Sequence, residues 1–253
     1  MKLYRADMHI HTCLSPCGDW GMSPRAIVDK SRQKGLDIIA ICDHNTAENT
    51  GAAIRAGQKC GLTVLPGMEI CTKEEVHVLA IFETPDRAVM MQSFVYAHLP
   101  GKNSPDVWGE QIVADEKDEV ITENSRFLIG ATTLSIYELV NKINDLDGLC
   151  IAAHIDRSAF GIVSNLGFIP EDLQFTALEV SWRMPLSEAA VSIPGISNFP
   201  CITSSDAHYI EDVGKVWTGF MLEAPTFDEI RMALAGRLGR RIVQKETIGK
   251  EVR

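Results

Sequence analysis

Residues 2–11, Lys2-Leu3-Tyr4-Arg5-Ala6-Asp7-Met8-His9-Ile10-His11, begin in the pattern of a strand and end in two histidines. Residues two apart in a strand point to the same face, so His9 and His11 are expected to direct two imidazoles at one point. This arrangement suits a divalent metal, although an isolated pair also fits two histidines in a polar pocket. The other histidines favour the metal, because six of the seven in the chain fall in short polar segments at the ends of apolar runs.

Length and composition limit the class of protein. A chain of 253 residues that is 45% apolar is long enough for one large α/β domain, or for a domain with an inserted subdomain. Its apolar runs are far shorter than the ~18 residues of a membrane helix, and its first residues lack the features of a signal peptide. We therefore expect a cytoplasmic protein that does not enter a membrane.

The seven cysteines are odd in number and scattered, which indicates a reducing compartment rather than a disulfide framework. Cys13 and Cys17 lie close to the histidine pair in the sequence. No second cysteine pair completes a metal site with them, so we interpret both as structural.

The formal net charge of −10 argues against a broad basic surface, and no duplex DNA partner is expected. The charge does not exclude a small anionic substrate, because a group of divalent metals would make one pocket locally positive. A small phosphorylated molecule or a short nucleic acid therefore stays open as the substrate. The sequence does not indicate an oligomeric state.

Apolar runs and helical patterns alternate along most of the chain. After the first strand, further strands are expected at residues 36–42, 63–69, 76–82, 148–153, 177–180, 201–204 and 216–222. Helices are expected at residues 23–34, 47–60, 86–99, 135–144 and 226–238, followed by a polar tail. The order strand, helix, strand, helix, strand in the first 82 residues predicts a parallel sheet or barrel.

Residues 84–133 break this rhythm. After the expected helix comes a loop rich in Pro, Gly, Asn and Ser, and then two short apolar segments that flank Asp115-Glu116-Lys117-Asp118. These segments fit either a hairpin or a polar helix–turn. We interpret residues 84–133 as an insertion near the site that could act as a lid, within one barrel domain that spans residues 1–253.

The candidate metal ligands share a position in the predicted fold, because most of them stand where an apolar strand gives way to a loop. In a parallel α/β barrel the carboxyl ends of the strands meet on one face, which is where sites are built. The candidates are His9, His11, Asp19, His44, Glu69, His77, His154, Asp206 and His208.

These segments resemble a known family, the PHP (polymerase and histidinol phosphatase) metal-dependent phosphoesterases. The matching segments cover residues 7 to 208 and occur in the family's order: Asp7-x-His9-x-His11, Asp19 five residues before Pro24, Cys42-Asp43-His44-Asn45, Pro66-Gly67-Met68-Glu69-Ile70, His77-Val78-Leu79, Ala153-His154 and Asp206-x-His208. The resemblance implies an α/β fold of the TIM-like, PHP type, a distorted (β/α)₇ barrel, with up to three divalent metals.

The resemblance also assigns ligands to each metal. The first metal would be held by His9, His11, Glu69 and Asp206. Glu69 would bridge to a second metal held by His77 and His154. Asp19, His44 and His208 would hold the third.

The donor types suit such metals independently of the family. Imidazoles and carboxylates without a required thiolate fit Mn²⁺, Fe²⁺ or Zn²⁺, do not choose among them, and leave Mg²⁺ open. Each carboxylate offers two oxygens, which favours Glu69 as a bridge. Asp7 and Asp43 precede or flank ligating histidines, so we expect them to orient ligands rather than bind metal.

Clustered metals make a phosphoesterase the leading function, because they lower the pKa of a bound water and neutralise charge on the phosphate. Asp206 or His208 could assist proton transfer. Arg157, three residues after His154, is the best candidate to grip a phosphate, with Arg183 as a weaker second.

One departure from the family lies beside a ligand. Many members carry proline after the histidine that corresponds to His154, where this chain has Ile155. The geometry of that loop is therefore not carried over from the family.

Alternative functions stay open. The family's known substrates are nucleoside bisphosphates, short oligonucleotides with a 5′ phosphate and histidinol phosphate, so a histidinol-phosphate-type phosphomonoesterase is one alternative. Other classes are an amidohydrolase-like enzyme that cleaves C–N bonds and a metal-binding module without catalysis.

Overall fold

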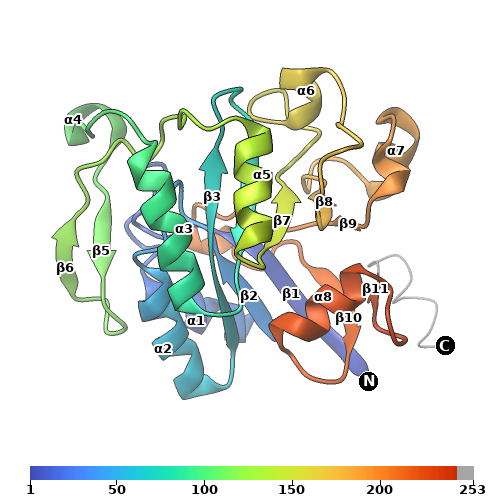
Figure 1. The fold of residues 1–253 in the computed structure, drawn as a ribbon. Coiled ribbons are helices and arrows are strands. Elements are labelled where there is room, and N and C mark those ends of the chain that lie inside the picture. Colours follow the sequence, from blue (N-terminus) through green and yellow to red (C-terminus); the bar gives the residue numbers. More distant parts are fainter. Residues whose placement is uncertain (244–253) are drawn as a thin grey trace.

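One curved sheet organises the residues that the computed structural model describes, 1–243 (Figure 1). Nine strands of this sheet run in the order β11-β10-β1-β2-β3-β4-β7-β8-β9. Their bounds are β1 (Lys2–Ile10), β2 (Ile38–Ile41), β3 (Thr63–Cys71), β4 (His77–Ile81), β7 (Leu149–Ala152), β8 (Ala177–Glu179), β9 (Cys201–Ile202), β10 (Thr218–Leu222) and β11 (Arg241–Val243).

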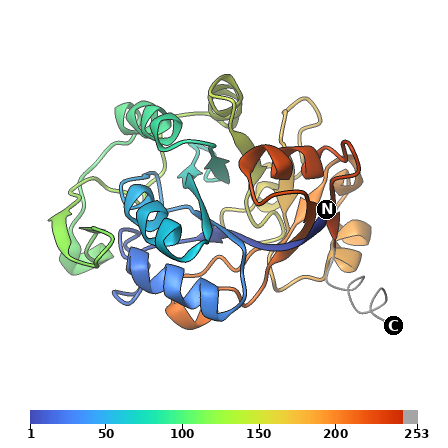
Figure 2. The same ribbon diagram turned by 90° about the horizontal axis from the view of Figure 1, so that it is seen from below.

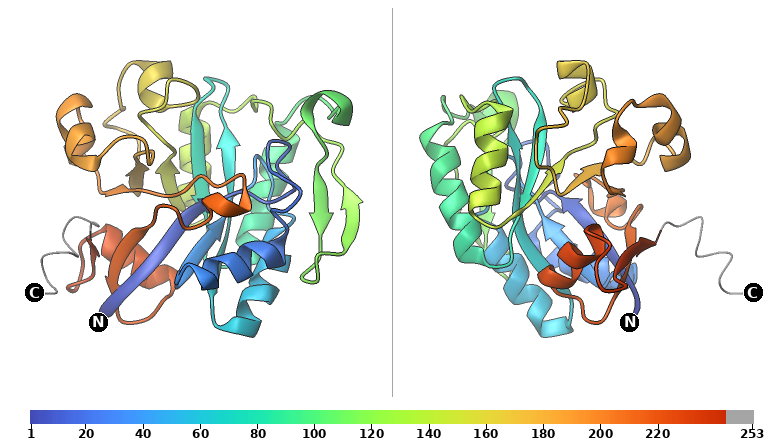
Figure 3. Two further views of the ribbon diagram at one scale, coloured as in Figure 1. Left: turned by 180° about the vertical axis from the view of Figure 1, so that it is seen from behind. Right: turned by 45° about the vertical axis from the view of Figure 1, so that its right-hand side comes forward.

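The sheet nearly closes into a barrel. Strand β10 pairs with only the first half of β1, from Lys2 to Ala6, which leaves the second half free on that side. There, Ile10 forms a parallel bridge with Ala207, in the segment after β9. The ribbon of this segment passes close to β1 (Figure 3). Seven strands from β1 to β9 thus surround the interior, and the expectation of a distorted seven-stranded TIM-like barrel is confirmed.

Strand β4 corrects the expectation of a parallel sheet. It runs antiparallel to β3 and to β7, whereas β1, β2 and β3 are parallel to one another. Only residues 72–76 connect β3 to β4, which is too short for the crossover that a parallel pair needs. The reversed direction brings the first residue of β4, His77, to the same end of the barrel as the last residues of the parallel strands.

Helices surround the outside of this sheet (Figure 2). The long ones are α1 (Pro24–Gln33), α2 (Thr50–Cys60), α3 (Pro85–Ala97), α5 (Ile136–Asp145) and α8 (Phe227–Leu234). The serine before α1, Ser23, accepts a hydrogen bond from the Ala26 amide, as an N-cap does. Ser135 and Glu138 form a reciprocal capping box at the start of α5.

Apolar side chains pack on both faces of the sheet, inside the barrel and under the surrounding helices. The strands are therefore buried on both sides. The interior cluster includes Tyr4, Met8 and Phe220 and extends to Phe227 and Ile230 of α8. Helix α8 lies at the amino-terminal ends of the parallel strands, the end opposite to the candidate ligands.

Residues 84–133 divide into two parts. Helix α3 packs Ala88, Met91 and Val95 into the same cluster as α5. A short helix α4 (Pro105–Trp108) and a hairpin of β5 (Ile112–Ala114) and β6 (Val120–Glu123) lie to the side of the barrel (Figure 1). A hairpin was one of the two forms expected there.

The remaining short elements connect the later strands. They are α6 (Ile162–Leu166), α7 (Leu186–Ser192) and the 3₁₀ helices η1 (Ile196–Asn198) and η2 (Ile210–Asp212).

Two expectations near the end of the chain need correction. Helix α8 ends at Leu234 rather than at residue 238, because Gly236 takes a left-handed backbone with φ of 62°. Residues 241–243, expected in a polar tail, form β11 beside β10. The rest of that tail, residues 244–253, lies outside the described residues. Within residues 1–243 no helix is long and apolar enough to cross a membrane.

Candidate metal centre

The carboxylate of Glu69 lies at the centre of the candidate site. Glu69 is in the second half of β3, is 1% exposed, and has five imidazoles around it. The ring nitrogens lie 2.9 to 3.5 Å from its two oxygens and belong to His9, His11, His44, His77 and His154. Every one of these side chains was predicted from the sequence, and the fold brings them together.

The two histidines of β1 have their ring orientations fixed by buried partners. His9 Nδ1 lies 3.1 Å from Oε1 of Glu179, and His11 Nδ1 lies 2.9 Å from Oγ of Ser15. If each Nδ1 donates its proton to these partners, both Nε2 lone pairs face inward. The two Nε2 atoms are 3.0 Å apart. Two lone pairs at this distance repel each other unless a proton or a metal ion lies between them.

Asp206 and His208 bring the last part of the barrel to the same place. Asp206 Oδ1 lies 3.5 Å from Nε2 of His9 and 3.3 Å from Nε2 of His11. The ring of His208 stacks on that of His11, with centroids 4.1 Å apart. Three groups of donor atoms are close enough to share an ion: His9, His11 and Asp206; His44, Glu69 and His77; His11, His44 and His208.

The two aspartates expected to orient ligands are both buried, and each accepts hydrogen bonds from groups next to a predicted ligand rather than from the ligand itself. Asp43 accepts hydrogen bonds from the Thr12 amide and from Oγ of Ser15, the hydroxyl that holds His11. Asp7 accepts from the backbone amide of Ser205, directly before Asp206. Burial raises the pKa of Asp7 to about 6.

Asp19 is the one predicted ligand that lies outside both the three donor groups and the set of imidazoles around Glu69. Its side chain is exposed and accepts a hydrogen bond from the Gly21 amide, although its own amide donates to the His208 carbonyl. Cys17, interpreted from the sequence as structural, instead lines the cavity beside His44. The assignment of Asp19 to a third metal stays a prediction.

The donors fit divalent ions. Nδ1 of His154 is buried and has no hydrogen-bond partner among the described residues. Burial lowers the pKa of His77 to about 4, so this ring is neutral and can offer a lone pair. Burial alone would raise the pKa of Glu69, but the rings of His77 and His9 and hydrogen bonds from neighbouring imidazoles hold it well below its usual range. A buried carboxylate surrounded by imidazoles is a donor set that Mn²⁺, Fe²⁺ or Zn²⁺ can occupy.

Glu179 is a buried carboxylate at the site that the sequence reasoning did not select. It is 1% exposed, contacts His9, and accepts a hydrogen bond from the His154 amide at 3.2 Å. Burial alone would lower the pKa of His9, but the negative charge of Glu179, Glu69 and Asp206 holds it well above its usual value. The sequence held a signal for Glu179, because this acidic residue lies at the end of an expected strand, where most of the predicted ligands also lie.

A cavity with two arms opens over the candidate ligands. The larger arm, of about 500 Å³, is lined by Trp108, Phe127 and Phe160 in addition to ligands. The smaller arm, of about 290 Å³, is lined by polar residues that include Arg183. Arg157 lines both arms, and its guanidinium binds the Asp206 carboxylate at 2.5 Å.

The backbone is strained around this cavity. Four residues that line the larger arm have φ values of 27° to 61°, in or near the left-handed region that side chains other than glycine rarely adopt. They are Glu75, His154, Phe160 and Asp206. Such strain persists only where surrounding contacts hold it, and it concentrates at functional sites.

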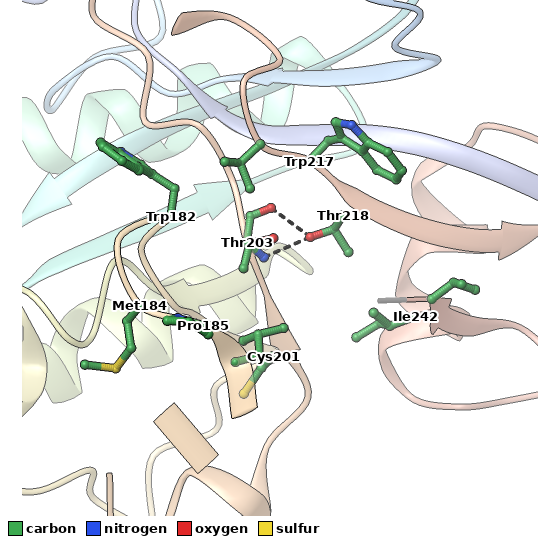
Figure 4. A pocket seen from close by; sticks show the side chains of 11 residues that line it. Trp182, Met184, Pro185, Cys201, Thr203, Trp217, Thr218 and Ile242 are labelled. Atoms are coloured by element: carbon green, nitrogen blue, oxygen red, sulfur yellow. Dashed lines mark hydrogen bonds between the residues drawn. The ribbon is translucent and has the colours of Figure 1, made fainter. Parts of the chain in front are cut away.

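A separate hollow of about 160 Å³ lies between the α7 loop and the last strands (Figure 4). Trp182, Trp217 and Ile242 line it, and the Thr218 hydroxyl bonds both the amide and the carbonyl of Thr203 beside it. Among residues 1–243, none of its lining residues is a predicted ligand. The chemistry therefore centres on the two-armed cavity.

The fold and the site together define a class of protein: a TIM-like barrel with a cluster of imidazoles and carboxylates that could ligate metal at the ends of its strands. A family model described as PHP domain matches residues 7–171, and one described as PHP-associated matches residues 194–237. The chain therefore belongs to the PHP domain family.

Individual proteins and solved structures are also similar to this chain. An uncharacterized Bacillus subtilis protein, YqxK, is 24% identical over 96% of this chain and 65% of its own length. Endonuclease Q, crystallised with a 27-mer duplex substrate that carries an abasic lesion, has a TM-score of 0.73 at 20% identity over 95% of this chain and 58% of its own. A putative metal-dependent phosphoesterase from Bifidobacterium adolescentis has a TM-score of 0.57 at 21% identity, over 80% of this chain and 87% of its own. The chain thus spans less than two thirds of YqxK and of endonuclease Q.

Proposed function

We propose that the protein is a phosphoesterase that hydrolyses a small phosphorylated substrate, a nucleotide, a nucleoside bisphosphate or a short 5′-phosphorylated oligonucleotide, at a site with three divalent ions. The observation that carries this proposal is the convergence of predicted ligands and Arg157 at the junction of the two cavity arms. A phosphate there would contact the Arg157 guanidinium on one side and the predicted ligands on the other.

The ligands divide by position. His9, His11, Glu69 and Asp206 would hold one ion. Glu69, His77 and His154 would hold a second ion. His44 and His208, with Asp19 as predicted from the sequence, would hold the third. Ions at these positions would supply positive charge for the phosphate oxygens and lower the pKa of water.

The chain's own residues would do the rest. Arg157 would bind a non-bridging phosphate oxygen and orient the ester, exchanging its present partner Asp206 for the substrate. His208, which is 23% exposed where the other rings are buried, is placed to pass a proton between the site and solvent. The buried Glu179 and Ser15 would keep the β1 histidines in their ligating tautomers.

The expectation that excludes duplex DNA is not part of the proposal. It rests on net charge alone, and a protein of the same fold has been crystallised with a duplex substrate. Duplex oligonucleotides therefore belong in the substrate panel beside mononucleotides and 5′-phosphorylated single strands.

Metal content and hydrolysis test the proposal together. Protein purified without chelator should contain divalent metal, and with added Mn²⁺, Zn²⁺, Fe²⁺ or Mg²⁺ it should release phosphate or a nucleotide from at least one ester. An amide panel run in parallel would show a C–N hydrolase instead. No bound metal, or no ester hydrolysis with any of these metals, would overturn the proposal.

Two ligand variants sharpen this test. His9→Ala and Asp206→Ala should abolish turnover while the far-ultraviolet circular dichroism stays that of the wild type. His98→Ala is the matched control, because His98 lies at the end of α3 and its ring bonds the Phe94 carbonyl outside the site. Full activity in both ligand variants would contradict the assignment.

A further inference from the structure

We propose that the larger arm of the cavity is a stacking subsite for an aromatic ring, formed by Trp108, Phe127 and Phe160. The ligand chemistry is a phosphate ester whose alcohol part carries a planar ring, as a nucleobase does. The proposal rests on the proposed phosphoesterase function and adds to it the residues that select the substrate.

Phe160 places an aromatic face directly beside the ligand cluster. Its ring stacks on His77 with centroids 4.4 Å apart and an interplanar angle of 11°. Its carbonyl accepts a hydrogen bond from the His77 amide at 3.0 Å, and its backbone has a φ of 61°. The residue is 37% exposed, so surface remains on the cavity side for a second ring. A left-handed backbone at phenylalanine is costly, and here it holds the ring over the cavity.

Residues 84–133 supply the other aromatic wall. Trp108, at the end of α4, lies edge to face with Phe127, with centroids 5.3 Å apart. Trp108 is 47% exposed. The ring of Phe127 packs so closely on Gly130 that a Cβ at that glycine would overlap it. A Cβ added at Gly101 would lie 3.3 Å from the Phe127 Cβ. The Phe127 ring is therefore held in one place and in turn supports Trp108.

Asn45 fixes this wall relative to the ligands. Its side-chain amide donates to the carbonyls of Leu128 at 2.7 Å and Gly130 at 2.8 Å, and its Oδ1 accepts from the Cys71 amide. Asn45 is buried and directly follows His44. The same loop thus carries a predicted ligand and holds the segment next to Phe127, which sets the distance between the ring-binding wall and the reacting phosphate.

The charges in the arm favour a neutral ring over a second phosphate. Among the described residues that line it, Arg157 is the one cationic side chain other than histidine, and it stands at the junction with the smaller arm. Glu75 adds a carboxylate to the wall. The phosphate would therefore bind at the junction, and an uncharged aromatic group would extend between Trp108 and Phe160. Stacking of a base on aromatic side chains is tolerant of sequence but requires a planar ring.

Binding of two matched ligands tests the subsite. The probes are the non-hydrolysable 5′-methylene phosphonate analogues of AMP and of ribose 5-phosphate, which differ only in the base. The protein is loaded with Mn²⁺, and calorimetry gives both dissociation constants. The wild type should bind the AMP analogue about 5- to 150-fold more tightly than the ribose analogue, the range expected for one stacked base. Trp108→Ala should lose most of this ratio, and Trp108→Tyr should keep most of it.

Trp20→Ala is the matched control, because Trp20 is 70% exposed and does not line the cavity described above. It should leave the ratio unchanged. Equal binding of the two analogues by the wild type, or a ratio that survives in Trp108→Ala, would overturn the subsite. Ester hydrolysis without preference for the ring would refute the subsite and leave the proposed function standing. Ring-dependent binding without hydrolysis of any ester would support the subsite and refute the proposed function.

Discussion

Replacement of Glu179 by glutamine should weaken metal binding without unfolding the protein. The Glu179 carboxylate is 1% exposed, and its oxygens lie 3.1 and 3.3 Å from Nδ1 of His9, while Oε1 also accepts from the His154 amide at 3.2 Å. Glutamine keeps Oε1 for both donors but removes the negative charge that makes His9 a stronger donor to a metal. Loss of such an outer partner costs about 10- to 100-fold in metal affinity, which equals ~1.4–2.7 kcal/mol.

Alanine at the same position separates orientation from folding. Glu179→Ala leaves two buried donors, on His9 and His154, without an acceptor, at about 1–3 kcal/mol each. We therefore expect a loss of about 2–6 kcal/mol in the free energy of unfolding for alanine and a smaller loss for glutamine, which keeps an acceptor for both donors.

Two measurements read these effects independently. Competition with a chromogenic chelator gives the affinity for Zn²⁺ or Mn²⁺, and urea unfolding in excess EDTA gives stability without metal. Glu188→Gln, on the exposed surface of α7, is the control for removing one negative charge. If Glu179→Gln binds metal within twofold of the wild type, Glu179 does not orient a ligand and the reasoning fails.

Three further changes follow from single contacts. Gly130→Ala should lower the free energy of unfolding by ~1–3 kcal/mol, because its Cβ would overlap the neighbouring phenylalanine ring, whereas Gly51→Ala in α2 meets only a flexible guanidinium and should be neutral or stabilising by up to ~1 kcal/mol. Equal urea midpoints for the two variants would contradict this. Ser135→Ala removes the capping box of α5 and should cost ~1 kcal/mol by thermal unfolding, and an unchanged midpoint would show that the box does not stabilise the helix. Arg157→Ala should raise KM for a phosphate ester by ~10- to 150-fold, the value of a hydrogen bond to a charged group, while Arg183→Ala has a smaller effect; the opposite ranking would place the phosphate in the smaller arm.

The sequence was sufficient to predict the strands because long apolar runs mark buried strands of a barrel. The run at 36–42 became β2 (Ile38–Ile41) and that at 76–82 became β4 (His77–Ile81). The apolar pattern alone could not give the direction of β4, because such a pattern has no polarity. The short connection of residues 72–76 carried that information, since it cannot form a crossover.

The candidate ligands were predictable for a related reason. Residues that end parallel strands must meet at one rim, so His44 and His154 could be placed together without knowledge of their loops. Phe160 and Trp108 could not, because their position depends on loop conformation and on a left-handed backbone that no pattern in the sequence encodes. Asp19 shows the same limit, since its place in a loop did not determine where its side chain points.

The bridge between Ile10 and Ala207 gives the barrel a seam, and the seam runs through the candidate site. His9 and His11 stand on one side of it, and Asp206 and His208 stand on the other. An ion held from both sides would join two points of the chain that are almost 200 residues apart. Closing so long a loop costs about 5 kcal/mol of chain entropy by the estimate used for covalent cross-links. The metal would therefore link the two sides of the domain. Its removal should first increase amide hydrogen exchange along β1 and the segment after β9, while exchange in the helices stays unchanged.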